Sequence, residues 1–322
     1  MNNIQNLVYH SLYEIPKFMI VFHEFDTFRR LCMLKRRDVN RGALSMNSIL
    51  QQPIWRFYDQ SISAKQRSPL ESFATDDTLC QLVGQLASPP TIRTWVHDAS
   101  VVLGIQDHRL PYVQQGMELL QARAYQPIVR NSGGLAVVLD AGVLNISIVL
   151  SEQTEALSIN DGYDVMVALI KGLFPEVADR IEAYEIVGSY CPGSYDLSID
   201  GKKFAGISQR RLRQGVAVQI YLCIEGSGSE RAALIRDFYE VSLQGEATKF
   251  TYPSIDPSVM ASLSELVDAT LTVEAVIIRL QRLIHKMAEE IRFESFHDEE
   301  LMLYAFYLKR ILERNKKMLA PK

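Results

Sequence analysis

Several features that define common classes of protein are scarce or missing in this sequence of 322 residues. Its four cysteines, Cys32, Cys80, Cys191 and Cys223, lie far apart and form no CxxC pair, which argues against a zinc site and against a disulfide framework. The six histidines show no HxxxH or HxH spacing, so we expect no bound metal. The sequence also contains no Walker loop, no internal repeat and no low-complexity tract.

Long apolar runs and an excess of basic residues are missing as well. The longest apolar run near the N-terminus, residues 18–22, is far too short to span a membrane, and acidic residues flank it instead of a small-residue cleavage site. The net charge of -4 argues against a nucleic-acid partner. Because 48% of the residues are hydrophobic, the chain can bury a full core, and we expect a cytoplasmic globular protein.

The chain divides into three segments by its pattern. Residues 1–45 hold a basic cluster and no helical or strand period, so we expect an N-terminal extension that is either disordered or not translated, with Met46 opening the regular part. Residues 46–253 alternate strand-like and helical runs and should form the main domain. Residues 254–322 predict a small C-terminal helical appendage. One expected helical stripe in this appendage consists of Ile277, Leu280, Ile284, Met287 and Ile291.

The pattern of the main domain predicts an α+β fold with mixed, mainly antiparallel sheets and flanking helices. Residues 74–86 and 110–124 are expected to be helical and residues 101–103 extended. The apolar runs 135–139 and 144–150 predict neighbouring antiparallel strands joined by a turn.

The clearest local signal is a hairpin. Asp200-Gly201 separates the runs 195–199 and 202–207, and this dipeptide favours the type I′ turn. Residues 216–224 should continue the sheet, and Ser227 with Glu230 predicts a capping box that opens the next helix.

Cys191 is the best candidate for a nucleophile, because Pro192 and Gly193 predict a loop in which its side chain is accessible. A thiolate attacks carbonyl groups readily, and an amine can then attack the resulting thioester. Lys203 follows the hairpin turn, so the pairing should fold it back towards Cys191, where an ammonium favours the thiolate. The alternative for each residue is ordinary: a buried apolar cysteine and a solvated lysine. That alternative is preferred for Cys80 and Cys223, which lie in apolar patterns.

Two further features suggest binding. Residues 130–134 (RNSGG) precede a strand, and their paired glycines allow backbone N–H groups to approach a carbonyl or phosphate oxygen, although such turns are more often simple connections. Residues 202–213 form a basic strip without any acidic residue. We expect this strip either to dock an acidic carrier domain or to be a basic strand edge that prevents edge-to-edge pairing. Its docking residues are Lys202, Arg210, Arg211 and Arg213, beside Lys203.

Three separated blocks resemble motifs of the lipoate-protein ligase family, in that family's order. The first resembles the signature RRxSGGGAVxHDxGxxNxS and consists of residues 130–137 (RNSGGLAV) with Asp140, Gly142, Asn145 and Ser147. Residues 203–206 (KFAG) resemble the lysine motif KxxG. Residues 188–197 (GSYCPGSYDL) resemble the cysteine block of the lipoyl amidotransferases, which belong to the superfamily of lipoate- and biotin-protein ligase catalytic domains.

This resemblance implies a catalytic domain of that superfamily, a thioester on Cys191, and Lys203 as the residue that assists the thiol and contacts the acyl carbonyl. It implies that an octanoyl or lipoyl group moves from the lysine of the glycine cleavage H protein to the lipoyl-domain lysine of E2 subunits of 2-oxoacid dehydrogenases, without a dissociable cofactor. The substrate-binding residues that it implies are Arg130, Ser132, Gly133, Gly134, Leu135, Asn145 and Gly206.

Other functions stay open on sequence grounds. An octanoyltransferase that draws on acyl carrier protein has a related fold and also uses a cysteine. An ATP-dependent lipoate-protein ligase needs ATP and Mg²⁺, but Leu135 and Leu139 replace the third glycine and the histidine of the ligase signature, which argues against adenylate formation. A silent binding module has no need of Cys191 and Lys203 together.

Overall fold

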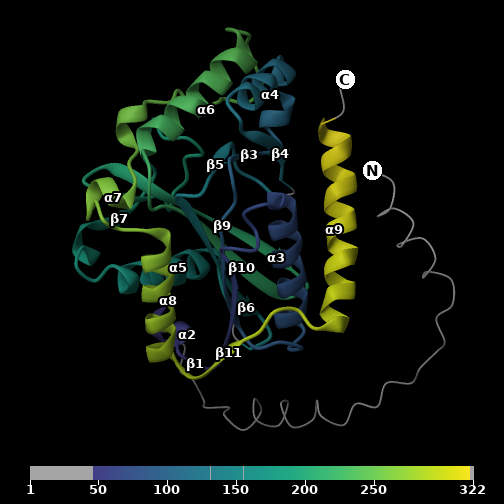
Figure 1. Cartoon of the computed structure of the whole chain (residues 1–322), viewed down its shortest axis with the longest axis vertical. Helices are drawn as coiled ribbons and strands as arrows, with labels where there is room; N and C mark the ends of the chain where they lie inside the picture. Colours follow the sequence, from purple (N-terminus) through teal and green to yellow (C-terminus); the bar gives the residue numbers. More distant parts are fainter. Residues whose placement is uncertain (1–45, 131, 155, 320–322) are drawn as a thin grey trace, which may run out of the picture. The chain divides into compact units, whose positions relative to one another are not determined.

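The computed structural model describes residues 46–130, 132–154 and 156–319, and the predictions made for residues 1–45, including Cys32, lie outside these ranges. The described residues form two sheets covered by helices, which confirms the predicted α+β class (Figure 1). No helix within these ranges has the length and the apolar character needed to cross a membrane.

The larger sheet has eight strands in the described part of the chain, and most neighbours are antiparallel. The order is β11-β1-β2-β6-β10-β9-β8-β7, in which β11, β1 and β2 run parallel and the other neighbouring pairs antiparallel. Their bounds are β1 Gln52–Gln60, β2 Thr91–Trp95, β6 Val143–Ser151, β7 Ile181–Ala183, β8 Leu197–Ile199, β9 Lys202–Leu212, β10 Gly215–Cys223 and β11 Ala288–Phe293. Strands β6 and β10 are buried along their whole length, so both of their faces pack against other layers.

The predicted hairpin forms between β8 and β9. Asp200 and Gly201 adopt φ angles of 52° and 75°, and positive φ at both central residues is what a type I′ turn requires. Ser198 pairs with Lys203 across the hairpin. This register returns Lys203 to the chain that precedes β8, where Cys191 lies.

The smaller sheet consists of β4 (Gln126–Val129), β3 (Ser100–Leu103) and β5 (Val137–Leu139), in that order. The prediction that residues 135–139 and 144–150 are neighbouring strands is wrong, because β5 pairs with β3 whereas β6 lies between β2 and β10 of the larger sheet. Both strands are fully buried and lack the alternation that identifies a pairing face. The chain changes sheets at Asp140, whose carboxylate accepts two hydrogen bonds of 2.7 Å from the Arg231 guanidinium.

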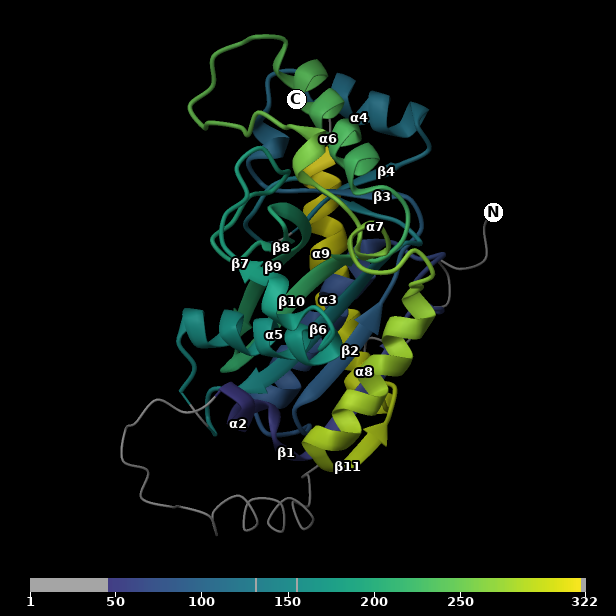
Figure 2. The ribbon, with the colours of Figure 1, turned by 90° about the vertical axis from the view of Figure 1, so that its left-hand side faces the viewer.

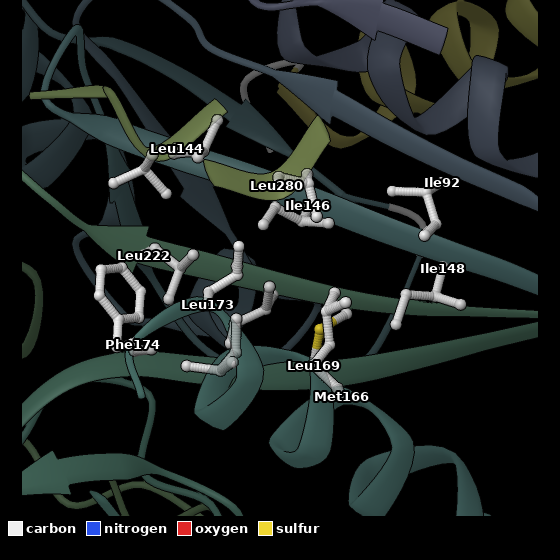
Figure 3. Packing of buried hydrophobic residues seen from close by; sticks show 14 of the residues in the cluster. Ile92, Leu144, Ile146, Ile148, Met166, Leu169, Leu173, Phe174, Leu222 and Leu280 are labelled. Carbon is white, nitrogen blue, oxygen red and sulfur yellow. The ribbon is translucent and has the colours of Figure 1, made fainter. Parts of the chain in front are cut away.

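Helices cover both faces of the larger sheet (Figure 2). Helix α5 (Ile159–Leu173) and helix α8 (Val273–Met287) pack on one face, where Leu169 and Leu280 lie near Ile146 of β6 (Figure 3). Helix α3 (Pro69–Gly84) packs on the opposite face against Val149 and Ala217. The other described helices are α2 Met46–Leu50, η1 Asp107–Arg109, α4 Val113–Ala122, η2 Ala178–Arg180, α6 Gly228–Leu243, η3 Pro257–Val259, α7 Leu263–Leu266 and α9 Asp298–Leu319.

Helix caps explain where several of these helices begin. Ser227 accepts a hydrogen bond from the Glu230 N–H, which is the Ser227 half of the predicted capping box, and opens α6. Ser158 and Asp161 form a reciprocal capping box at the start of α5, and Ser68 precedes Pro69 at the first position of α3. Local sequence therefore determines the N-terminal ends of these covering helices.

The C-terminal segment contains a strand that the helical pattern does not predict. Ile277, Leu280, Ile284 and Met287 lie on the buried side of α8 as expected, but the placement of Ile291 in the same helix is wrong, because it belongs to β11. Strand β11 pairs in parallel with β1. Helix α9 then runs beside α3 (Figure 1). The segment thus extends the larger sheet as well as covering it.

Candidate active site

Cys191 lies in the loop between β7 and β8, with its side chain partly exposed and its backbone in the left-handed region at φ 45°. A residue with a β-carbon pays on the order of 1–2 kcal/mol for this conformation. Gly188, three residues earlier, has φ 88° and accepts a hydrogen bond from the Asp256 N–H at 2.8 Å. The loop is therefore held in a strained conformation at the residue that sequence reasoning identifies as the nucleophile.

The Cys191 sulfur faces the glycine-rich turn of residues 130–135. Its Sγ accepts hydrogen bonds from the Leu135 N–H at 3.3 Å and from Arg130 Nη2 at 3.6 Å. Arg130 is buried, and its Nη2 also donates to the Leu135 carbonyl at 2.8 Å. The structure thus brings together Cys191 and the turn, two features that are 56 residues apart in sequence.

Gly134 is required at this turn by both conformation and space. Its φ is 94°, and a β-carbon at this position would lie 2.1 Å from Arg130 Nη2 and 3.4 Å from Cys191 Sγ. Any side chain would therefore displace the guanidinium from the sulfur. Ser132 is partly exposed and Gly133 exposed in the same turn, and a β-carbon on Gly133 would meet nothing within 4 Å.

Lys203 lies beside Cys191, as the hairpin predicts, but its ammonium binds backbone oxygens rather than the sulfur. Nζ donates to the carbonyls of Tyr190 and Cys191 at 2.9 and 3.0 Å, and to Ser189 Oγ at 3.2 Å. It also forms an ion pair with Asp196 Oδ1 at 2.9 Å. Since an ammonium has three N–H groups, these four oxygens engage all of its donors. The fully buried Lys203 side chain therefore anchors the backbone of the nucleophile loop.

Asp196 is the partner of Lys203, and sequence reasoning did not assign it a role. Its Oδ2 accepts hydrogen bonds of 3.2 Å from the N–H groups of Ile186 and Gly193, which lie on both sides of Cys191 in the loop. Burial raises the pKa of Asp196, and the Lys203 ammonium opposes this shift. Removing either member would leave a buried charge without its partner, so the two residues act as one anchor.

Two tyrosine rings enclose the Lys203 ammonium. Nζ lies 5.9 Å from the centre of the Tyr190 ring and 6.0 Å from that of Tyr221, distances at which a cation is attracted to a ring face. The Tyr221 ring also covers Gly206, where a β-carbon would lie 2.6 Å from Tyr221 Cε1. The glycine of the predicted KxxG motif is thus needed for the ring to occupy its place.

A narrow cavity of about 40 Å³ opens between the two sheets, lined by Arg130 and Tyr221 from the sulfur side. It contains three of the predicted substrate-binding residues, Arg130, Asn145 and Gly206. Lining residues that sequence reasoning missed are Phe73, Trp95, Val102, Val137, Leu139, Ser208, Gln219, Ile220 and Tyr221. Because they come from both sheets and from α3, only the fold reveals that they form a mostly apolar pocket.

A larger open hollow of about 640 Å³ lies elsewhere, at the corner where the chain passes between the sheets. Asp140, Gly142 and Arg231 line it, and none of the predicted catalytic or substrate-binding residues does. The candidate active site is therefore the narrower cavity, because Arg130, which lines it, also donates to the sulfur of Cys191, the only described thiol that is not fully buried. Within the described residues, no group of three or more His, Cys, Asp or Glu side chains could hold a metal ion.

The predicted basic docking strip does not form as one free surface. Arg210 pairs with Asp77 of α3 at 2.7 Å, and Arg211 is bound by Glu152 and by the carbonyls of residues 157 and 158. Adjacent strand residues also point to opposite faces. Lys202 and Arg213 are exposed, one at each end of β9. Most of the positive charge of the strip is thus neutralised within the protein.

Comparison with known proteins gives a family match and close relatives. Residues 68–285 match the family described as "Lipoyl protein ligase A/B catalytic domain". The chain is 84% identical over 274 residues to the "Octanoyl-[GcvH]:protein N-octanoyltransferase" of Lysinibacillus sphaericus (strain C3-41), across 85% of this chain and 99% of the relative. It is 48% identical over 273 residues to the "Lipoyl-[GcvH]:protein N-lipoyltransferase" of Listeria monocytogenes serovar 1/2a, across 85% and 98% of the two chains.

Solved structures share the fold at low sequence identity. Lipoate-protein ligase A bound with ATP matches with a TM-score of 0.57 at 17% identity, over 81% of this chain and 95% of that chain. A bipartite lipoate protein ligase from Thermoplasma acidophilum matches with a TM-score of 0.55 at 15% identity, over 84% and 99%. At these identities the likeness establishes the fold alone.

Proposed function

The chain belongs to the lipoyl protein ligase A/B catalytic-domain family, and on that premise we propose that it is an acyltransferase with Cys191 as its acyl carrier. It takes an octanoyl group from the lysine of the glycine cleavage H protein and passes it to the lipoyl-domain lysine of E2 subunits of 2-oxoacid dehydrogenases. The names of the relatives support the donor and the octanoyl or lipoyl cargo. The observation that carries the mechanism is the sulfur of the partly exposed Cys191, which faces two hydrogen-bond donors, one of them Arg130 in the wall of the apolar cavity.

Two transfers make up the reaction. The Cys191 thiolate attacks the carbonyl carbon of the octanoyl-lysine amide, and the C–N bond breaks as the lysine nitrogen takes up a proton. The neutral amine of the acceptor lysine then attacks the thioester and gives up one proton, which balances the proton taken up in the first step; the C–S bond breaks, and the thiolate is restored. Each attack places negative charge on the carbonyl oxygen, which preorganised donors stabilise best. The Leu135 N–H and the Arg130 guanidinium lie next to the sulfur and are the donors in reach of that oxygen.

Lys203 contributes by holding the loop. Its bonds to the Tyr190 and Cys191 carbonyls and to Asp196 keep Cys191 at φ 45° with its sulfur towards the turn. Because its donors are engaged by protein oxygens, these contacts support an anchoring role over proton donation to the leaving amine. The acyl chain enters the cavity between the sheets, which has to widen from about 40 Å³ to hold eight carbons, and Val102 and Ile220 offer it an apolar wall.

The proposed reaction requires neither ATP nor a metal ion, since the acyl group arrives as an amide and leaves as an amide. Leu139, which stands where the ligase signature has a histidine, is buried in the wall of the cavity. We place the protein in the cytoplasm, where a reducing environment keeps a nucleophilic thiol free of disulfide formation.

The test is intact-mass analysis of the pure protein after incubation with octanoylated glycine cleavage H protein and then with an apo-E2 lipoyl domain, without ATP. Wild type should gain one octanoyl group and pass it to the lipoyl domain, and Cys191→Ala should do neither. Cys80→Ala is the matched control, because it removes a fully buried thiol from α3, and it should keep the adduct. Transfer by Cys191→Ala, or transfer only with ATP and free acid or only from acyl carrier protein, would overturn the proposal.

A further inference from the structure

Asp107 is a fully buried carboxylate near the sulfur for which the proposed chemistry has no direct use. It lies in η1, and both of its oxygens accept hydrogen bonds: Oδ2 from the Gly104 N–H at 2.7 Å and Oδ1 from the Tyr239 hydroxyl at 2.8 Å. Tyr239 belongs to α6 and is also buried. The two residues are 132 positions apart, so the fold has to bring them together.

Both bonds lead to the glycine-rich turn. The Tyr239 hydroxyl oxygen accepts a hydrogen bond from the Ala136 N–H at 3.4 Å. On the other side, Gly104 presses against the turn so closely that a β-carbon there would lie 1.8 Å from the Gly134 carbonyl oxygen. Asp107 thus holds Gly104 against Gly134, the residue before Leu135. Through Tyr239 it also holds the N–H of Ala136, the residue after Leu135.

Leu135 lies between these two points, and its own N–H donates to Cys191 Sγ. From this arrangement we propose that Asp107 and Tyr239 are positioning residues, which aim the Leu135 N–H at the Cys191 sulfur and at the oxygen of the acyl group that the sulfur attacks. The inference deepens the proposed function and rests on it.

The free-energy cost of burying the Asp107 carboxylate supports a specific role for this residue. A buried carboxylate is expensive unless hydrogen bonds compensate for its lost hydration. Burial raises the pKa of Asp107 to about 6, so at neutral pH the group is mainly ionised and can accept both hydrogen bonds. A protonated or neutral replacement would lose one acceptor position. The carboxylate therefore suits the task of holding two donors at once.

The experiment compares Asp107→Asn and Tyr239→Phe with wild type in single-turnover formation of the Cys191 thioester from octanoylated glycine cleavage H protein. Tyr307→Phe is the matched control, since it removes another buried tyrosine hydroxyl, which donates to Gln81 Oε1 at 2.6 Å in the contact between α9 and α3. We expect both test variants to acylate at least about tenfold more slowly, with KM for the donor changed less than about twofold. The control should stay within about twofold of wild type.

Three outcomes would overturn the inference: acylation of both variants within twofold of wild type, a rise in KM without a fall in rate, or an equal loss in Tyr307→Phe. If wild type itself forms no thioester, the proposed function fails first and the inference fails with it. Unfolding curves of all variants separate a loss of fold from a loss of alignment.

Discussion

Asp107 and His97 are both fully buried, and their pKa values are shifted in opposite directions, which makes the pH dependence of stability a test of the structure. Burial raises the pKa of Asp107 from 3.8 to about 6. Burial and the nearby Arg93 guanidinium lower the pKa of His97 from 6.5 to about 4. Neutral His97 is accommodated by Ser72 Oγ at 3.0 Å and by the Arg67 carbonyl at 3.1 Å.

The two groups act on the free energy of unfolding with opposite signs. The folded protein binds the Asp107 proton more tightly than the unfolded chain, so its contribution is full below pH 3.8 and is lost as pH rises through about 6. His97 contributes above pH 6.5 and loses this contribution as pH falls through about 4. On going from about pH 7.5 to about pH 5, linkage gives a gain of about 1.4 kcal/mol from Asp107 and a loss of about 2 kcal/mol from His97.

Replacing either residue should therefore leave the contribution of the other to the pH dependence of the free energy of unfolding. Asp107→Asn is expected to lose about 1.4 kcal/mol more than wild type over this pH interval, and His97→Gln about 2 kcal/mol less. Urea denaturation at the two pH values, followed by the fluorescence of the buried Trp55 and Trp95, measures each difference. Shifts shared by all proteins cancel in the comparison.

A refuting result is easily recognised. If the free energy of unfolding changes between the two pH values by the same amount in Asp107→Asn and wild type, within about 0.5 kcal/mol, the Asp107 carboxylate does not titrate near pH 6. Its burial then does not have the assigned cost.

Two further predictions concern packing and the corner between the sheets. Gly206→Ala should slow thioester formation and lower the free energy of unfolding by about 1–3 kcal/mol, because its β-carbon would overlap the Tyr221 ring. Mass analysis measures the rate of thioester formation, and urea denaturation measures the free energy of unfolding. If neither value changes, the ring is free to move. Asp140→Asn should lower the free energy of unfolding by about 3–5 kcal/mol, because it leaves the buried Arg231 without its carboxylate partner. Asp200→Asn removes an exposed ion pair with Arg180 and should lower the free energy of unfolding by at most about 1 kcal/mol. Similar losses in the two variants, measured by urea denaturation, would contradict this difference.

Local signals in the sequence were sufficient for the hairpin and for the approach of Lys203 to Cys191. Asp200 and Gly201 tolerate positive φ angles, so the dipeptide predicts the tight turn. Antiparallel pairing across that turn then places Lys203 opposite Ser198 and near the loop of Cys191. The start of α6 at Ser227 follows from the same kind of short-range chemistry.

Contacts between distant elements could not be predicted in this way. Arg210 looks like a free cation until α3 places Asp77 beside it, 133 residues earlier. The orientation of the Lys203 ammonium depends on the carbonyls of a loop with two residues at positive φ, Gly188 and Cys191, which no periodicity indicates. The pairing of β5 and β6 with different sheets was hidden because both are wholly buried.

Strand β11 has a consequence for the order in which the chain can fold. Its register with β1 begins at Gln52 and Ala288, whereas β2 pairs with β1 only from Arg56 onward. During synthesis the first residues of β1 therefore emerge without a partner and keep unpaired N–H and C=O groups until residues 288–293 have left the ribosome. The family match ends at residue 285, just before this strand. A product cut short there would carry an open strand edge, able to pair with another molecule and to start aggregation.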